Sequence, residues 1–282
     1  MSETNSNSQS RLHGIWALTN RELKKWYKEP IPLLLSIIQP VIWMGLFGKA
    51  MNLGAIFTGN AQIPPQIAQQ LMFQTFKTDD YFSYMALGMV SFVVLFTTMF
   101  SGMSIVWDRR LGFLNKVLST PVSRGVIVFS KVLSATFRSM IQAGIVIVLA
   151  LAFGMKFGAT FSPINILGVF AAIFLICLGL SSLFLAIAIR STRMETHMAV
   201  ANLLTLPLMF ASNTFFPVSL MPDWIQIVAK INPVTYTTDA VRQLLIYTID
   251  GTQLLIDFTY LGVFAAVFTT MGIVLSWRYL SK

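Results

Sequence analysis

Six long apolar stretches constrain the fold of this chain more than any other feature of its sequence. They lie near residues 31–53, 84–107, 126–155, 164–189, 197–216 and 256–277. A transmembrane helix needs about 20 mostly apolar residues to cross roughly 30 Å of hydrocarbon. The stretches therefore predict an all-α polytopic membrane protein with six transmembrane helices.

The composition excludes a soluble globular domain. Only 11% of the 282 residues are charged and 55% are hydrophobic, whereas about 25% charged residues are usual in soluble domains. The net charge of +9 does not indicate a nucleic acid partner, because the basic residues cluster in short segments between apolar runs. The single cysteine, Cys177, has no partner for a disulfide or a thiolate metal site.

The same basic residues predict the orientation of the spans. With a cytoplasmic N-terminus, most Lys and Arg residues fall on the cytoplasmic side, which fits the positive-inside rule and an even number of crossings. Both termini are therefore expected in the cytoplasm. Residues 1–10 are polar, are expected to be flexible and show no cleavable signal peptide. We expect a multi-pass protein of the plasma (inner) membrane of a prokaryote.

Two basic residues, Lys131 and Arg138, fall near or inside the third apolar stretch. Arg138 lies about three helical turns into this stretch, because an α-helix has about 3.6 residues per turn. We expect this helix to begin below the membrane, with both side chains snorkelling to the inner headgroups. The alternative is a buried charge with a functional role.

Three segments are neither spans nor simple loops. Residues 11–29 predict a basic amphipathic helix on the inner leaflet, either a topology anchor or a partner-binding element. Its assigned residues are Trp16, Glu22, Lys24, Lys25 and Trp26. Residues 217–247 contain two short amphipathic pieces broken at Asn232-Pro233. They are too short to cross, and they predict a re-entrant helical hairpin in the outer leaflet.

The third segment follows the second span and predicts a short cytoplasmic helix at 108–120. Asp108 can cap it, since a carboxylate is favoured at the positive end of a helix, and Pro121 stops it. Leu111, Leu114, Val117 and Leu118 form its apolar stripe. Such a helix is either a connector or a docking site.

The chain lacks the residues that nucleotide hydrolysis requires. A phosphate loop ends in Gly-Lys-Ser/Thr, and GLFGKA at 45–50 lacks both the first Gly and the hydroxyl. His13 and His197 are the only histidines and belong to no metal motif. The alternative function, a membrane-embedded lipid-modifying enzyme, would have to use Asp239 and Asp257. We expect no catalytic, metal or cofactor site in this chain.

Two segments stand out as motifs: WDRRLGFLNKVLSTPVSR (107–124) and PDWIQIVAKINPVTYTTDAVR (222–242). Both resemble segments of the permease subunits of ABC-2 type exporters, particularly the daunorubicin/multidrug-type branch. The resemblance covers nearly the whole chain and implies one transmembrane domain at 11–282. It implies export of an amphiphilic substrate such as a drug, lipid or lipid-linked glycan. A separate ATPase subunit, which binds ATP and Mg²⁺, would supply the energy.

The resemblance also assigns roles to residues. It makes 108–120 the coupling helix, with the ATPase docking on Asp108, Arg109, Arg110, Leu111, Phe113, Leu114, Val117 and Leu118. On that assignment, replacing Leu114 and Val117 by Asp would abolish ATPase binding but not membrane insertion. Many relatives carry Glu where this chain has Asp108, which leaves the role of that carboxylate open.

By the same resemblance two permease chains, expected to be a homodimer in membrane lipid, form the pore. Spans one, two and five would lie near its axis. The candidate pathway residues are Phe92, Phe96, Met99 and Phe100 on span two and Asn202, Thr205, Met209 and Asn213 on span five. The alternative for these faces is helix packing.

Overall fold

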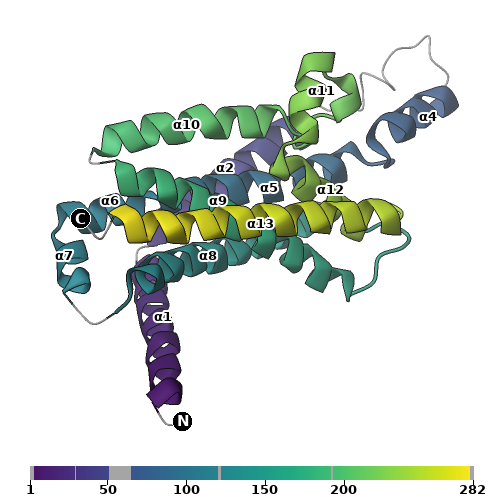
Figure 1. Ribbon diagram of the computed structural model, residues 1–282. Helices are drawn as coiled ribbons and strands as arrows, with labels where there is room; N and C mark the ends of the chain where they lie inside the picture. Colours follow the sequence, from purple (N-terminus) through teal and green to yellow (C-terminus); the bar gives the residue numbers. More distant parts are fainter. Residues whose placement is uncertain (1–2, 29, 51–64, 120–121, 192, 280–282) are drawn as a thin grey trace.

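The computed structural model describes residues 3–28, 30–50, 65–119, 122–191 and 193–279 (Figure 1). Every regular element in these ranges is helical, which confirms the predicted all-α fold for this part of the chain. In chain order the elements are α1 (Glu3–Lys28), α2 (Pro30–Trp43), the π-helical η1 (Met44–Ala50), α4 (Pro65–Phe76), α5 (Tyr81–Ser101), α6 (Met103–Arg110), α7 (Phe113–Leu118), α8 (Arg124–Ala152), α9 (Asn165–Arg190), α10 (Met194–Phe210), the 3-10 turn η2 (Val218–Leu220), α11 (Asp223–Lys230), α12 (Pro233–Leu245) and α13 (Gly251–Tyr279).

The bundle has two ends, which we call the α7 end and the α12 end (Figure 1). Gly125, at the start of α8, faces Trp277 near the end of α13. Thr19 of α1 donates a hydrogen bond to the carbonyl of Ser130 in α8, at 3.3 Å. α1 and the end of α13 therefore both contact the first turns of α8, at the α7 end.

Among the described residues, four helical segments are long and apolar enough to span a membrane: Gln69–Arg110, which contains α5 and α6, then α8, α9 and α13. A fifth candidate is the pair α1 and α2, which is bent by 67°. α10 has 17 residues, about 26 Å at 1.5 Å per residue, and falls short of the roughly 30 Å of hydrocarbon. The described residues thus supply four or five of the six predicted spans. The end of the first one, 51–53, lies outside them.

The fifth predicted span, 197–216, is shorter in the structure because another segment caps it. α10 ends at Phe210, where the last carbonyls of a helix have no partner within the helix. The side-chain amide of Asn232 donates to the carbonyls of Leu208 and Ala211, at 2.8 and 2.6 Å. The chain after Phe210 is therefore free to turn toward η2.

Asn232 also organises the predicted hairpin. Its side-chain oxygen accepts from the backbone N–H of Val234, at 3.0 Å, and Pro233 occupies the first turn of α12, where a missing N–H costs nothing. The two short helices predicted within 217–247 are confirmed as α11 and α12. α12 packs against α5, α9 and α13.

At the other terminus α1 begins at Glu3. The helix thus extends into the 1–10 segment expected to be flexible, because each residue added to an existing helix gains one backbone hydrogen bond.

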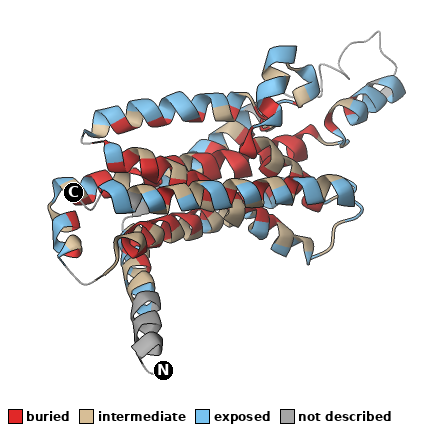
Figure 2. Cartoon of the chain, in the orientation of Figure 1, coloured by how far each residue is buried: buried red, intermediate tan, exposed pale blue. Residues whose placement is uncertain are grey.

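Buried residues concentrate on α5, α9 and α12, whereas α10 and α13 expose much of their length (Figure 2). The exposed positions include large apolar side chains, such as Leu203 (72%) on α10 and Leu34 (56%) on α2. Apolar surface on this scale faces lipid or another protein chain.

Candidate functional site

The predicted coupling helix is two short helices that meet at a corner. α6 ends at Arg110 and α7 begins at Phe113. Gly112 between them has a φ of 70°, a left-handed conformation that glycine adopts without steric cost. Asp108 lies inside α6, so the predicted N-cap role is wrong. The predicted last residue, Thr120, lies outside the described residues.

The apolar stripe of this segment is split between the core and the surface. Leu114 and Val117 are 3% and 9% exposed and pack in a hydrophobic cluster formed with α6, α8 and α9. Leu111, in contrast, is 69% exposed. A double Asp substitution at Leu114 and Val117 would therefore place two charges in the core, so it would not test docking alone. The exposed positions from residue 107 to residue 119 are Trp107, Arg110, Leu111, Asn115, Lys116 and Ser119.

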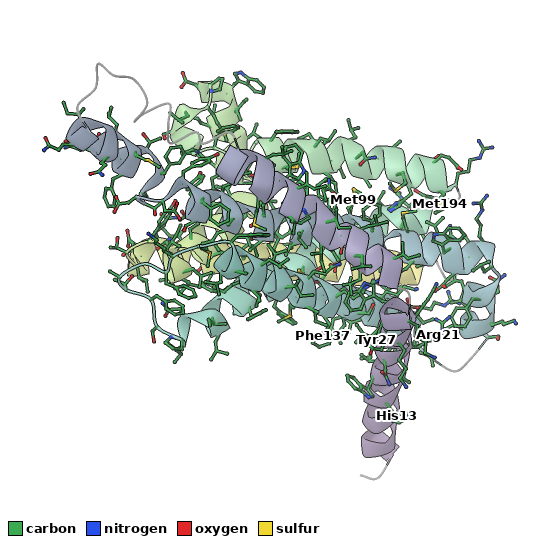
Figure 3. The ribbon with its side chains drawn as sticks, turned by 180° about the vertical axis from the view of Figure 1, so that it is seen from behind. His13, Arg21, Tyr27, Met99, Phe137 and Met194 are labelled. Atoms are coloured by element: carbon green, nitrogen blue, oxygen red, sulfur yellow. The ribbon has the colours of Figure 1, made fainter. Side chains whose placement is uncertain are left out.

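Two arginines fix the corner to its neighbours. Arg109 donates to the carbonyls of Ile189 and Ser191, at 2.8 and 3.0 Å, where α9 ends. The guanidinium of Arg21 on α1 lies 3.6 Å from the ring centroid of Phe113, a cation–π arrangement. Figure 3 shows Arg21 at this end of the bundle. The corner is thus tied to both α1 and α9.

An ion cluster beneath the corner joins three helices. Lys131 of α8 lies 2.5 Å from Asp108 of α6 and 3.4 Å from Glu22 of α1. Its Nζ also donates to Ser104, at 3.4 Å. All three charged side chains are less than 10% exposed. The expected snorkelling of Lys131 is therefore wrong, because two carboxylates hold the ammonium inside the protein.

The residues assigned to the interfacial helix divide in the same way. Trp16 is 58% exposed, and Lys24 and Lys25 are also exposed. Glu22 is 8% exposed and belongs to the ion cluster. Trp26 lines a cavity. One face of α1 therefore contacts the bundle, and the other carries the basic residues.

That cavity, which we call the α2–α5–α8 cavity, has a volume of about 390 Å³. Its wall is formed by Trp26, Leu35, Ser36, Gln39, Phe92, Val93, Phe96, Thr97, Phe100, Arg138 and Gln142. Three of the four candidate pathway residues of span two therefore lie together in it. Met99 does not line this cavity. It is buried on another side of α5, where its backbone contacts His197 of α10.

The four candidates on span five do not form one face. Asn202 is exposed, whereas Thr205 and Met209 are buried. Asn213 lies beyond the end of α10, and its carbonyl accepts hydrogen bonds from Arg242 and Tyr84. The side of α10 that carries Thr205 and Met209 therefore packs against the bundle. This agrees with helix packing, the alternative to substrate contact for these residues.

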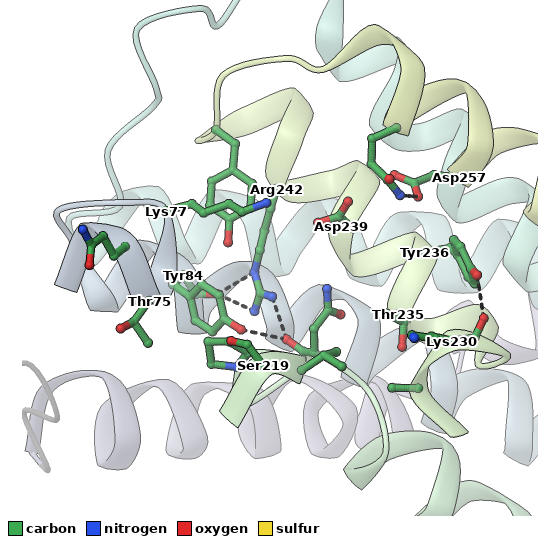
Figure 4. Close-up of a pocket in the computed structure, with 17 residues that line it drawn as sticks. Thr75, Lys77, Tyr84, Ser219, Lys230, Thr235, Tyr236, Asp239, Arg242 and Asp257 are labelled. Carbon is green, nitrogen blue, oxygen red and sulfur yellow. Dashed lines mark hydrogen bonds between the residues drawn. The ribbon is translucent and has the colours of Figure 1, made fainter. Parts of the chain in front are cut away.

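A buried arginine at the α12 end was missed by sequence analysis. Arg242 of α12 is 1% exposed. It donates four hydrogen bonds of 2.6 to 3.2 Å to the carbonyls of Tyr84, Asn213 and Thr214. Figure 4 shows Arg242 beside Tyr84. Its guanidinium also lies 3.5 Å from the ring centroid of Tyr84. Among the described residues no carboxylate forms an ion pair with it, so backbone carbonyls and the ring of Tyr84 compensate the charge.

Glycine at position 88 permits this contact. A Cβ on Gly88 would lie 2.0 Å from the carbonyl oxygen of Thr214 and 3.1 Å from a terminal nitrogen of Arg242. α5 can approach the 212–214 segment this closely only because no side chain intervenes.

Beside Arg242 lies a polar cavity of about 510 Å³ (Figure 4). The amide of Gln243 donates to Asp239 and Asp257, at 2.9 and 3.1 Å, and that of Gln253 donates to Asp257, at 2.9 Å. Burial raises the pKa of Tyr247 at its edge, so this phenol stays protonated. Asp239 and Asp257, the two acids that a lipid-modifying enzyme would have to use, therefore accept hydrogen bonds from glutamine side chains.

The sequence matches the family described as ABC-2 type transporter over residues 13–246. It is also similar to the ycf38 proteins, named as transport permeases, of Cyanophora paradoxa and Porphyra purpurea. The identity to the first is 28% over 230 residues, 81% of this chain and 72% of that protein. The identity to the second is 30% over 234 residues, again 81% of this chain and 72% of that protein.

The daunorubicin resistance ABC transporter permease protein DrrB1 of Streptomyces coeruleorubidus is more distant. It is 22% identical over 169 residues, 60% of this chain and 59% of that protein. The resemblance to ABC-2 permeases is therefore confirmed at the level of the family, whereas the daunorubicin/multidrug branch is not established.

Proposed function

The chain belongs to the ABC-2 type transporter family, and from that premise we propose that it is the membrane subunit of an exporter of amphiphilic compounds. Membership makes it a permease, a transmembrane subunit without catalytic activity of its own. One observation carries the proposal. The α6–α7 corner is joined to α1, α8 and α9 through buried contacts while it presents a basic face outward. A rigid corner of this kind suits the transmission of movement from a partner to the spans.

In this proposal a separate ATP-binding subunit, carrying ATP and Mg²⁺, docks on the exposed face of the corner. That face carries Arg110, Leu111 and Lys116. This docking surface differs from the one assigned by the resemblance, which is centred on Leu114 and Val117. Those two side chains pack in the hydrophobic core. Charged side chains at a docking surface favour a partner of opposite charge and speed its association.

We further propose the complete topology of six crossings, with α10 and the residues after it as the fifth. Both termini would be cytoplasmic in the plasma membrane of a prokaryote, and 217–247 would dip into the outer leaflet. A second copy of the chain would complete the pore. The exposed apolar faces of α2 and α10 support this arrangement, since they need cover by lipid or protein. Drugs, lipids and lipid-linked glycans are the substrate classes that an amphiphilic pathway suits.

The docking surface leads to a first prediction. In the variant Leu111→Asp, Lys116→Glu both side chains change on the exposed face and no buried contact is lost. We expect at least about tenfold less ATP-binding subunit to co-purify with the permease, because the new negative charges meet an acidic or apolar partner surface. The measurement is the ratio of the two subunits after affinity purification through a tag on the permease.

The matched control is Ile67→Asp, Lys156→Glu, which changes one exposed aliphatic residue to Asp and one exposed Lys to Glu outside the predicted spans and the hairpin. It should retain the wild-type ratio. Wild-type recovery of the ATP-binding subunit with the Leu111 and Lys116 variant would sink the assignment of this face.

A further inference from the structure

The α2–α5–α8 cavity contains a charge that the fold does not use. Arg138 lies in its wall, and its one hydrogen bond runs from Nε to the carbonyl of Ser134 on the same helix, at 3.3 Å. No carboxylate among the described residues forms an ion pair with it. Glu22 interacts electrostatically with Arg138, but its carboxylate already forms ion pairs with Lys131 and Arg21.

A cation in a membrane-spanning helix is costly, and such residues usually serve a ligand or a partner. The rest of the cavity explains what kind of ligand fits. The rings of Phe92 and Phe96 are in tilted contact, with their centroids 4.5 Å apart, and Phe100 continues the apolar wall one turn further along α5. Opposite them Gln142 accepts from Thr97 and donates to Ser36, both at 2.5 Å. The cavity therefore offers one cation, an aromatic wall and a short polar row.

The register between α5 and α8 sets the order of these groups along the membrane normal. The bond from Thr97 to Gln142 places these residues at one level, and the two helices run in opposite directions (Figure 1). Arg138 is one turn earlier on α8, so it lies near the level of Phe100, closer to the α7 end. Phe96 and Phe92 follow toward the α12 end. A ligand with its head at Arg138 would extend an alkyl chain along the two rings.

The cavity is also open at the surface of the bundle. Leu35 and Phe100, both in its wall, are 62% and 49% exposed. Its volume of about 390 Å³ lies at the lower end of the range of about 300–1,000 Å³ for small-molecule sites. It can hold a headgroup and part of one chain while the remainder stays in lipid.

We propose that the α2–α5–α8 cavity binds an anionic amphiphile, with the guanidinium of Arg138 paired to its phosphate or carboxylate. Planar guanidinium groups bind such oxyanions through two parallel hydrogen bonds. The proposal rests on the proposed function, since it narrows the class of amphiphile that the permease accepts at its α7 end. The same chemistry is present in a free anionic amphiphile and in an anionic membrane lipid.

The test measures binding of dodecyl phosphate to the purified full-length chain in phosphatidylcholine nanodiscs by calorimetry. We expect Arg138→Gln to weaken binding at least about tenfold and Arg138→Lys to weaken it only about threefold. The control Arg193→Gln removes an exposed arginine and should bind as the wild type does. Equal affinity of Arg138→Gln and wild type, or equal wild-type affinity for neutral dodecyl maltoside, would overturn the proposal.

A second variant keeps the test decisive if Arg138→Gln fails to fold. Leu35→Trp adds bulk at an exposed position of the cavity wall, leaves Arg138 in place and should also weaken dodecyl phosphate binding. Unchanged binding would count against the site. If dodecanoyl phosphatidylglycerol competes with dodecyl phosphate, the occupant is a membrane lipid. If it does not compete, the occupant is a free amphiphile. The assay contains no ATP-binding subunit, so its failure leaves the docking of that subunit unaffected.

Discussion

Replacing Arg242 by Met should lower the melting temperature of the purified permease by about 10 °C, the largest effect expected of one substitution at the α12 end. The guanidinium supplies four hydrogen bonds to three carbonyls. Methionine fills part of the space but leaves those carbonyls without a donor. Each buried polar group that loses its partner costs about 1–3 kcal/mol. Thermal unfolding followed by tryptophan fluorescence checks the result.

Two other variants separate the charge from its geometry. Arg242→Lys keeps the charge but cannot reach three carbonyls at once, so its melting temperature should fall between those of the Met variant and the wild type. Gly88→Ala leaves the arginine intact but forces Thr214 away, because the added Cβ would lie 2.0 Å from its carbonyl oxygen. It should therefore destabilise the same site. A melting temperature for Arg242→Met within about 2 °C of the wild type, less than 1 kcal/mol, would refute the structural role of the clamp.

The clamp shows what a local sequence pattern cannot reveal. By its place between the fifth and sixth predicted spans, Arg242 is expected on the outer side, and its nearest acid in the sequence is Asp239. In the structure its partners are backbone carbonyls of residues 84, 213 and 214. Carbonyls are present at every position, so no side-chain pattern marks the ones that will bind an arginine.

The long helices, in contrast, were predicted well. The stretch 164–189 became α9 (Asn165–Arg190), and 126–155 became α8 (Arg124–Ala152). An apolar run of this length determines its own helical structure, because the backbone hydrogen bonds are all local. The end of α10 was misplaced by several residues, since it depends on Asn232, which follows 22 positions after Phe210 in the sequence.

The coupling segment shows a different limit. The stripe containing Leu114 and Val117 correctly indicated an amphipathic helix, but amphipathicity does not say which surface covers the apolar face. The face packs on the α8 and α9 region of the same chain. What remains for a partner is the polar side, with Lys116 and the single exposed leucine, Leu111.

Replacing Lys131 by Met should destabilise the α7 end by about 3–5 kcal/mol, the usual cost of removing one partner from a buried ion pair. Asp108, 7% exposed, would then remain buried without a cation, and Glu22, 9% exposed, would keep only Arg21. We expect a melting temperature lower by about 10 °C. Lys116→Met, which removes an exposed lysine from α7, should melt as the wild type does.

The triple variant Lys131→Met, Asp108→Asn, Glu22→Gln separates stability from coupling. Arg21 also loses its partner Glu22, but its side chain is 41% exposed and can be hydrated. With no buried charge left unpaired, most of the lost stability should return, because a buried ion cluster replaced by uncharged groups is often tolerated. The link between α1, α6 and α8 would still be missing. If the cluster transmits movement from the corner, the reassembled transporter should hydrolyse ATP without moving substrate across proteoliposomes. Wild-type transport by the triple variant would mean that Lys131 serves only the fold. If the triple variant does not recover stability, the ion pairs themselves stabilise the α7 end.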